Sequence, residues 1–246
     1  MFRYQILIEY VGTDFIGWQI QKKGKSVQKT IEISLKKIIK EKISLVGQGR
    51  LDSGVHAISQ SAHFETKNKI LNTNKFLNRL NYLLNKDLIS ILSVKKRNKK
   101  FHSRYSAKAR IYQYIIFNRE SVPTIDKNRG WHIKKKINIE KLKKGAKFLI
   151  GKRDFSTFRA SSCSAKSPIR TLEKVNIFKK KNQISIEFKS KSFLQTQVRS
   201  MVGCLKYLGE GKWDLKRFKY VTLSKNRILC APPAPPYGLF LKKVIY

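Results

Sequence analysis

Large apolar side chains recur at every second position over residues 2–10, the first segment of the chain. A period of two predicts a strand with one buried face. From Val27 the apolar positions recur every three or four residues, which predicts an amphipathic helix with Ser26 as its N-cap. The same two periods predict a second helix starting near Thr73 and further strands at residues 43–46, 61–66 and 88–94.

The second half of the chain shows the same mixture of periods. Its predicted elements are strands at residues 110–117, 170–178, 184–188 and 239–246, and helices at residues 139–149, 195–208 and 215–223. Gly151 is expected to close the first of these helices, because glycine favours the position after a helix end. The proline-rich run Pro232–Pro236 is expected to form a stiff linker of polyproline type.

A basic, polar run at Lys95–Lys100 interrupts the pattern, and we place a domain boundary directly after it. The expected domains are an N-terminal half over residues 1–100 and a C-terminal half over residues 101–246. Both mix strands and helices without strict β–α–β alternation, which favours an α+β fold with mainly antiparallel sheets flanked by helices. The loosely similar order of elements in the two halves hints at a duplication.

The net charge of the chain says most about its candidate partners. The 246 residues include 54 Lys+Arg and 15 Asp+Glu, a formal net charge of +39. Such a surface attracts polyanions and releases their counterions on binding, so nucleic acid is the first candidate partner and an anionic membrane surface the second. The chain is also rich in Ile and Asn, as proteins from AT-rich genomes are, and many lysines could be solvated filler. The charge is therefore compatible with nucleic acid without indicating a reaction.

Several classes of protein are disfavoured. Three widely spaced cysteines and four histidines give neither a disulfide framework nor zinc-ligand spacing. No phosphate-binding loop, dinucleotide fingerprint or metalloprotease motif is present, so no cofactor and no metal are expected. The N-terminus does not resemble a signal peptide, and no apolar run approaches membrane-spanning length. We expect a soluble, reduced, cytoplasmic protein that does not contact membranes.

Acidic residues are scarce, and Asp52 stands out because it lies between Gly49 and Gly54 in a predicted loop. If the loop is extended, Arg50 points to the same side and keeps the carboxylate ionised and oriented, as a nucleophile or base requires. The alternative is an ion pair that merely staples a turn, and spacing alone favours it. We expect His56 to pack or hydrogen-bond within the loop rather than to act as a base.

Two further places could carry chemistry. Arg110, Tyr112 and Tyr114 share one face of a predicted strand, as a surface that stacks on bases requires, although tyrosines are also ordinary strand residues. Arg199 lies on an otherwise apolar helix and needs an anionic or hydrogen-bonding partner. A carboxylate or an RNA phosphate would serve; alternatively, the arginine reaches to solvent at the helix edge.

The segment Gly49-Arg50-Leu51-Asp52-Ser53-Gly54-Val55-His56-Ala57 closely resembles the signature of the TruA-type tRNA pseudouridine synthases. The resemblance covers nearly the whole chain. It continues in Glu9-Tyr10-Val11-Gly12-Thr13, Gly17-Trp18-Gln19, Ser26-Val27-Gln28, His63-Phe64-Glu65-Thr66, Phe101-His102-Ser103-Arg104-Tyr105, Ala109-Arg110-Ile111-Tyr112-Gln113-Tyr114, Asp154-Phe155-Ser156-Thr157-Phe158, Phe193-Leu194, Val198-Arg199, Val202-Gly203 and Gly238-Leu239-Phe240-Leu241.

This resemblance implies that the chain isomerises uridines at positions 38, 39 and 40 of the tRNA anticodon stem-loop, as a homodimer and without a cofactor. Asp52 matches the family's nucleophile, and Tyr112 matches the tyrosine that stacks on the target base and helps to move its C5 proton. Arg50 and Arg199 match arginines of the active-site cleft; one would pair with Asp52 and the other could hold RNA. Two similar α+β halves are expected to face each other across this basic cleft.

The chain departs from the family pattern around these positions. Leu51 and Ser53 replace the usual Thr and Ala, the run Gln195-Thr196-Gln197 replaces His-His-Met, and Ser200 replaces Asn. None of these is a matched Asp, Tyr or Arg, so the departures bear on turnover and site preference rather than on reaction class. The alternatives are a non-catalytic RNA-binding protein or RNA chaperone on the same fold, and a basic ribosome-associated structural protein.

Overall fold

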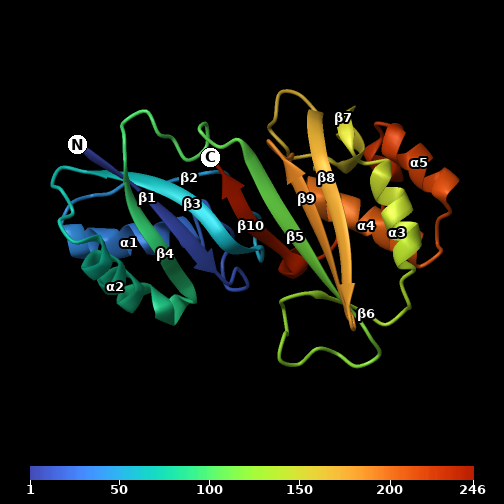
Figure 1. The fold of residues 1–246 in the computed structure, drawn as a ribbon, viewed down its shortest axis with the longest axis horizontal. Coiled ribbons are helices and arrows are strands. Elements are labelled where there is room, and N and C mark those ends of the chain that lie inside the picture. Colours follow the sequence, from blue (N-terminus) through green and yellow to red (C-terminus); the bar gives the residue numbers. More distant parts are fainter. The chain divides into compact units, whose positions relative to one another are not determined.

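The computed structural model describes residues 1–246, and Figure 1 follows their elements from blue to red. Contacts divide the chain into a first unit, residues 1–108 with 240–246, and a second unit, residues 109–239. The boundary expected after Lys100 would leave residues 101–108 and the last strand in the C-terminal half. Residues 101–108 stay with the first unit because they pack back on it; the Lys108 amide donates to the carbonyl of Ile245 (2.7 Å).

The sheet of the first unit has the strand order β4-β1-β3-β10, with β2 paired to β3. Its strands are β1 (Phe2–Tyr10), β2 (Val46–Gly47), β3 (His56–Thr66), β4 (Ile89–Arg97) and β10 (Leu239–Ile245). All pairs are antiparallel except β10 with β3. The strand predicted at residues 2–10 is confirmed. The basic break expected at Lys95–Lys100 is wrong at its start, because β4 pairs with β1 as far as Arg97, opposite Arg3.

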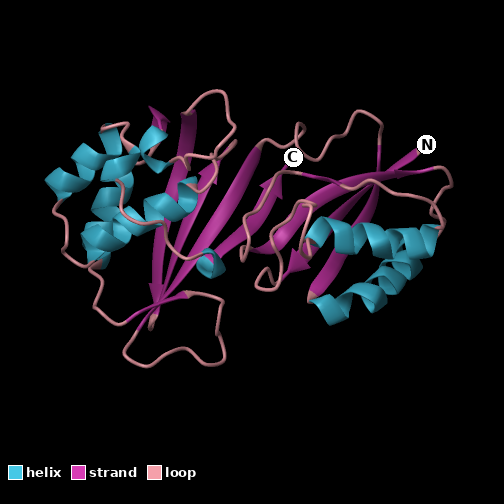
Figure 2. Ribbon diagram, turned by 180° about the vertical axis from the view of Figure 1, so that it is seen from behind, coloured by secondary structure: helices cyan, strands magenta, loops and turns pink.

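Two helices lie on one face of this sheet, as the view from behind shows (Figure 2). They are α1 (Val27–Ile39) and α2 (Thr73–Leu84). Ser26 caps α1 as predicted, since its hydroxyl accepts from the amide of Lys29 (3.3 Å). Asn72 caps α2 in the same way (2.8 Å). Side-chain oxygens at these positions satisfy amides that the first turn of a helix leaves without partners.

The strand predicted at residues 43–46 is mostly wrong, because only Val46 is extended and paired there. Helix α1 supplies the hydrogen bonds instead. Glu32 accepts from the amide of Leu45 (2.8 Å), and Gln28 donates to the carbonyl of the same residue (2.9 Å). Buried backbone groups need partners, and here helix side chains provide them in place of a neighbouring strand.

The second unit has a sheet of strand order β5-β9-β8-β7, all antiparallel, with β6 added parallel to β5. Its strands are β5 (Ala109–Asn118), β6 (Trp131–Ile133), β7 (Gly151–Asp154), β8 (Ile169–Lys180) and β9 (Gln183–Ser190). The predicted long strands are present. Strands β6 and β7 were missed because segments this short carry no readable period.

Three helices complete the second unit, again on one face of its sheet (Figure 2). They are α3 (Ile139–Lys147), α4 (Gln197–Gly209) and α5 (Leu215–Leu223). Helix α3 ends before the predicted Gly151, which begins β7 at φ 111°. Each unit is thus a mainly antiparallel sheet covered by helices, which confirms the predicted α+β fold of two similar halves.

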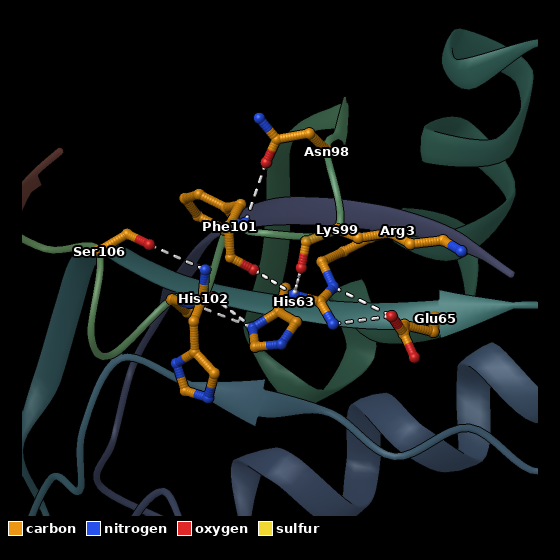
Figure 3. A network of polar contacts seen from close by, with 9 residues as sticks. Arg3, His63, Glu65, Asn98, Lys99, Phe101, His102 and Ser106 are labelled. Atoms are coloured by element: carbon orange, nitrogen blue, oxygen red, sulfur yellow. Dashed lines mark hydrogen bonds and ion pairs between the residues drawn. The ribbon is translucent and has the colours of Figure 1, made fainter.

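A network of polar contacts ties the segment after β4 to the sheet of the first unit (Figure 3). Arg3 on β1 forms an ion pair with Glu65 on β3 (2.8 Å) and donates to the carbonyl of Phe101. His63 on β3 accepts from the Ser103 amide through its Nδ1 (3.2 Å). An accepting Nδ1 carries no proton, so this buried imidazole is held in its neutral form.

We expect the stability of the first unit to fall below neutral pH because of His63. Burial, and then the charges of His102 and Arg3, lower the pKa of His63 to about 4. Above about pH 6.5 the imidazole is neutral in both the folded and the unfolded chain, so it does not reduce stability. As pH falls towards 4, the unfolded chain binds a proton at this ring and the folded chain does not, so the free energy of unfolding falls by up to about 3 kcal/mol. Urea unfolding at about pH 7 and about pH 4.5 measures the loss.

The control for this prediction is His63→Gln, which removes the titrating ring. Other groups titrate equally in both proteins, so the difference between their pH dependences isolates His63. The variant should lose less stability than the wild type between the two pH values. Equal losses would show that the neutral imidazole is not what makes the unit sensitive to acid.

Candidate active site

Asp52 opens a tight turn between β2 and β3. The amide of Val55 donates to the carbonyl of Asp52 (3.2 Å), and Gly54 takes a φ of 75°, which is unfavourable for residues with a Cβ. Asp52 is half-buried, whereas Leu51 and Val55 on either side are 6% and 2% exposed. The turn is therefore anchored on both sides, while Asp52 itself stays partly exposed.

The segment after β1 clamps this turn through its backbone. Trp18 donates from its amide to the carbonyl of Leu51 (3.1 Å), and the hydroxyl of Ser53 donates to the carbonyl of Phe15 (3.1 Å). Gly17 has a φ of 114°, and a Cβ on it would stand 2.6 Å from the Leu51 carbonyl oxygen. Only glycine permits this approach without a shift of backbone. The backbone of the turn is thus fixed before any substrate binds.

His56 supports the same turn from the interior, as predicted. Its ring is buried and stacked on Phe240 of β10, with centroids 4.7 Å apart. Its Nδ1 accepts from the amide of Gly12 (2.9 Å). The histidine therefore contacts β10 and the loop after β1 from the end of the turn, and its role there is structural.

Arg50 does not stabilise the turn through an ion pair with Asp52, contrary to what spacing alone favours. Its side chain is exposed, and no ion pair joins it to Asp52. The backbone contacts of the clamping segment hold the turn instead. The exposed guanidinium lies two residues from the carboxylate in sequence, where it is accessible to an anion from solution.

Tyr112 lies on β5 of the second unit, opposite Phe188 of β9. It is half-buried, and its ring meets the edge of Phe193 with centroids 5.1 Å apart and planes at 84°. Tyr114, on the same strand face, is completely buried and donates to the carbonyl of Pro235 (2.8 Å). Burial raises the pKa of its phenol. The expected three-residue stacking surface is therefore wrong for Tyr114, whose ring belongs to the core.

Arg199, near the start of α4, has a hydrogen-bonding partner as its apolar surroundings require. Its Nε donates to the carbonyl of Ala234 (2.7 Å), and the Ala234 amide donates back to the carbonyl of Arg199 (3.0 Å). A Cβ on Gly203 would stand 2.1 Å from the carbonyl oxygen of Pro232. The proline-rich run is thus not a free linker but a strap packed along α4, and it orients the guanidinium.

Asp52 and Arg50 belong to the first unit, and Tyr112 and Arg199 to the second. Sequence reasoning missed the clamp at Gly17 and the carbonyl of Ala234, whose roles depend on partners distant in sequence. The only available signal for the clamp was the Gly17-Trp18-Gln19 match.

The structure contains no cluster of three or more His, Cys, Asp or Glu that could hold a metal ion. None of its helices combines the length and apolarity needed to cross a membrane.

The chain is similar to known proteins over most of its length. A family model described as tRNA pseudouridine synthase matches residues 6–106 and 146–246. Proteins named tRNA pseudouridine synthase A are 64% identical in Pelagibacter ubique, over 100% of both chains, and 41% identical in Neorickettsia sennetsu, over 99% of this chain and 100% of the relative. One from Ehrlichia chaffeensis is 42% identical, with the same shares covered. The chain therefore belongs to the tRNA pseudouridine synthase family of isomerases.

Proposed function

We propose that this chain converts uridine to pseudouridine at positions 38, 39 and 40 of the tRNA anticodon stem-loop, with Asp52 as nucleophile and without a cofactor. We further propose that it works in the cytoplasm as a homodimer. The observation that carries the proposal is the Asp52 turn. A half-buried carboxylate stands at the family's signature position, on a backbone clamped by the Gly17 segment.

The chemistry asks for such a carboxylate. Isomerisation breaks the bond between N1 of the uracil and C1′ of the ribose, turns the base, and forms a bond between C5 and C1′. The C5 proton leaves, and N1 gains a proton, so atoms and electrons balance without an oxidant or reductant. Asp52 would add either to C6 of the ring or to C1′ of the sugar and leave again in a later step.

The clamped turn favours a high reaction rate because it holds the nucleophile in place before the substrate binds. A nucleophile held by backbone hydrogen bonds needs little reordering when the substrate arrives, and misplacement by about 1 Å can cost about a hundred-fold in rate. The target base has to leave its stack to reach an enzyme side chain. In the proposed site Tyr112 replaces the lost stacking, worth on the order of 1–3 kcal/mol per base.

The two arginines take different parts in this proposal. Arg50 is exposed and not paired with Asp52, which suits contact with an RNA phosphate. Arg199 is oriented by the Ala234 carbonyl, and its resemblance to an arginine of the family's cleft supports a role in the proposed active site. Arginine presents several donors in a fixed plane, so one hydrogen bond to the strap aims the others.

The Tyr112→Phe variant should turn over about a hundred-fold more slowly while tRNA affinity stays within about two-fold. The ring still stacks, but the hydroxyl that helps to move the C5 proton is missing, and proton transfer of this kind contributes about a hundred-fold or more. Single-turnover rates and equilibrium binding with an unmodified tRNA transcript measure the two effects. Tyr220→Phe, at an exposed tyrosine of the same unit, is the control. Normal turnover in Tyr112→Phe would exclude a role for the hydroxyl.

The proposed positions can be tested on transcripts in which uridine 38, 39 or 40 is replaced by cytidine, one at a time. Each replacement should remove pseudouridine at that position and leave the other two modified. Pseudouridine outside the anticodon stem-loop, or product that persists when all three uridines are replaced, would contradict the assignment of positions and leave the family membership intact.

A further inference from the structure

The segment after β4 ends in a turn, residues 102–106, that none of the catalytic roles uses. His102 and Ser106 close it reciprocally: the His102 amide donates to the Ser106 hydroxyl, and the Ser106 amide donates to the His102 carbonyl (both 2.9 Å). The imidazole Nδ1 of His102 also accepts from the amides of Arg104 and Tyr105 (3.1 and 3.3 Å). The histidine therefore organises the whole turn from inside.

The turn is also fastened to the first unit at its base (Figure 3). The hydroxyl of Tyr246, near the end of β10, donates to the carbonyl of Ser103 (2.8 Å), and its ring packs on Phe101 with centroids 5.0 Å apart. His63 accepts from the amide of Ser103, and its ring meets that of His102 at 4.8 Å. The turn is thus held at its base by contacts from both β3 and β10.

The outer side of the same turn carries an aromatic surface. The ring of Tyr105 is 76% exposed and lies against the ring of His102, with centroids 4.4 Å apart and planes at 34°. The guanidinium of Arg104 stands 5.6 Å from the centre of the tyrosine ring. Burial and the charges of Arg3 and Arg104 lower the pKa of His102, and the Nδ1 that accepts from two amides carries no proton. A rigid π surface with one adjacent cation is thus held out to solvent.

We propose that His102, Tyr105 and Arg104 form a stacking platform for an unpaired nucleotide of the tRNA substrate, separate from the Asp52 turn. Aromatic rings stack on bases, and an adjacent arginine meets the phosphate of the same nucleotide. The net charge of +39 favours this partner over a protein surface, which seldom offers enough negative charge to match it. The proposal rests on the proposed function for its substrate, and it adds a second place where that substrate is held.

The test is the affinity of each variant for an unmodified tRNA transcript, measured over a series of salt concentrations. Tyr105→Ala should bind about ten-fold more weakly with an unchanged salt slope, because stacking releases no counterions. Tyr105→Phe should bind like the wild type. Arg104→Ala should bind more weakly and lower the salt slope by about one, as the loss of one phosphate contact predicts. In turnover assays Tyr105→Ala should raise KM and leave kcat nearly unchanged.

The matched control is Tyr82→Ala on α2, another tyrosine of the first unit, 85% exposed and outside the platform. It should bind tRNA like the wild type, and all variants should unfold at the wild-type temperature because the altered groups are exposed. Wild-type affinity in Tyr105→Ala, an equal loss in Tyr82→Ala, or an equal loss in Tyr105→Phe would each overturn the platform. The binding measurement involves no chemical step, so it tests the platform even if the proposed reaction of Asp52 is wrong.

Discussion

Replacing Asp52 with asparagine is expected to slow pseudouridine formation at least about a thousand-fold, as removal of a nucleophile does in other enzymes. The amide keeps the shape of the side chain but lacks the negative charge needed to add to the base or the sugar. The turn itself should survive, because backbone groups hold it: the Val55 amide on the Asp52 carbonyl and the Trp18 amide on the Leu51 carbonyl. Affinity for tRNA should therefore stay within about two-fold.

The control for Asp52→Asn is Asp14→Asn, which removes an exposed carboxylate from the loop that clamps the turn. It should turn over and bind like the wild type, which separates the loss of one nucleophile from a general change in charge. Single-turnover rates, tRNA affinity and the thermal midpoint are compared for the three proteins. Retained turnover in Asp52→Asn would remove this residue from the mechanism.

Gly17→Ala is expected to lower turnover about a hundred-fold and to destabilise the protein by about 1–3 kcal/mol. Its φ of 114° is unfavourable for alanine, and the added Cβ would stand 2.6 Å from the carbonyl oxygen of Leu51. Leu51 is 6% exposed and its carbonyl accepts from Trp18, so the backbone of the turn has to move. A small displacement of Asp52 then costs rate, because reacting atoms tolerate little misplacement.

Gly49→Ala is the matched control on the other side of the same motif. Nothing lies within 4 Å of a Cβ added there, and its φ is not positive, so activity and stability should stay close to wild type. Rates at saturating tRNA and urea unfolding are compared for the two variants. Full activity in Gly17→Ala, or equal losses in both variants, would show that the clamp does not position the carboxylate.

The sequence predicted well what depends on neighbours along the chain. The long strands, the Ser26 cap and the α+β class follow from periodicity and local hydrogen bonding, which a window of about ten residues contains. Asp52 and Tyr112 came from motif matches whose order spans the chain. The role of His56 followed from its place in the loop, since a histidine that close to Asp52 and Ser53 leaves no room for a triad.

The failures have one physical cause, a partner that is distant in sequence. Spacing favoured an ion pair between Arg50 and Asp52, but the clamping segment around Gly17 holds the turn instead. Tyr114 shares a strand face with Tyr112, yet the Pro235 carbonyl and the core take it out of reach. The proline-rich run was predicted to be a linker, but the carbonyl of Ala234 within it accepts a hydrogen bond from Arg199. Periodicity reports which residues are buried, not which atoms they meet.

In each unit, the residue proposed for the chemistry is partly exposed and lies on a backbone held by buried neighbours. Half-buried Asp52 stands on a turn whose flanking residues are buried, and half-buried Tyr112 stands on a strand whose next same-face tyrosine is in the core. Each of the two proposed site residues is thus positioned by neighbours that cannot move without disrupting the core. Such fixed positioning is what the proposed cofactor-free reaction requires.

The most direct test of this account is a pseudouridine map of one tRNA transcript incubated with the wild-type chain and, in parallel, with Asp52→Asn. We expect pseudouridine at positions 38, 39 and 40 with the wild type, and unmodified RNA with the variant although it binds the same tRNA. The contradicting results are equal modification by both proteins, or a wild type that binds the transcript and forms no pseudouridine.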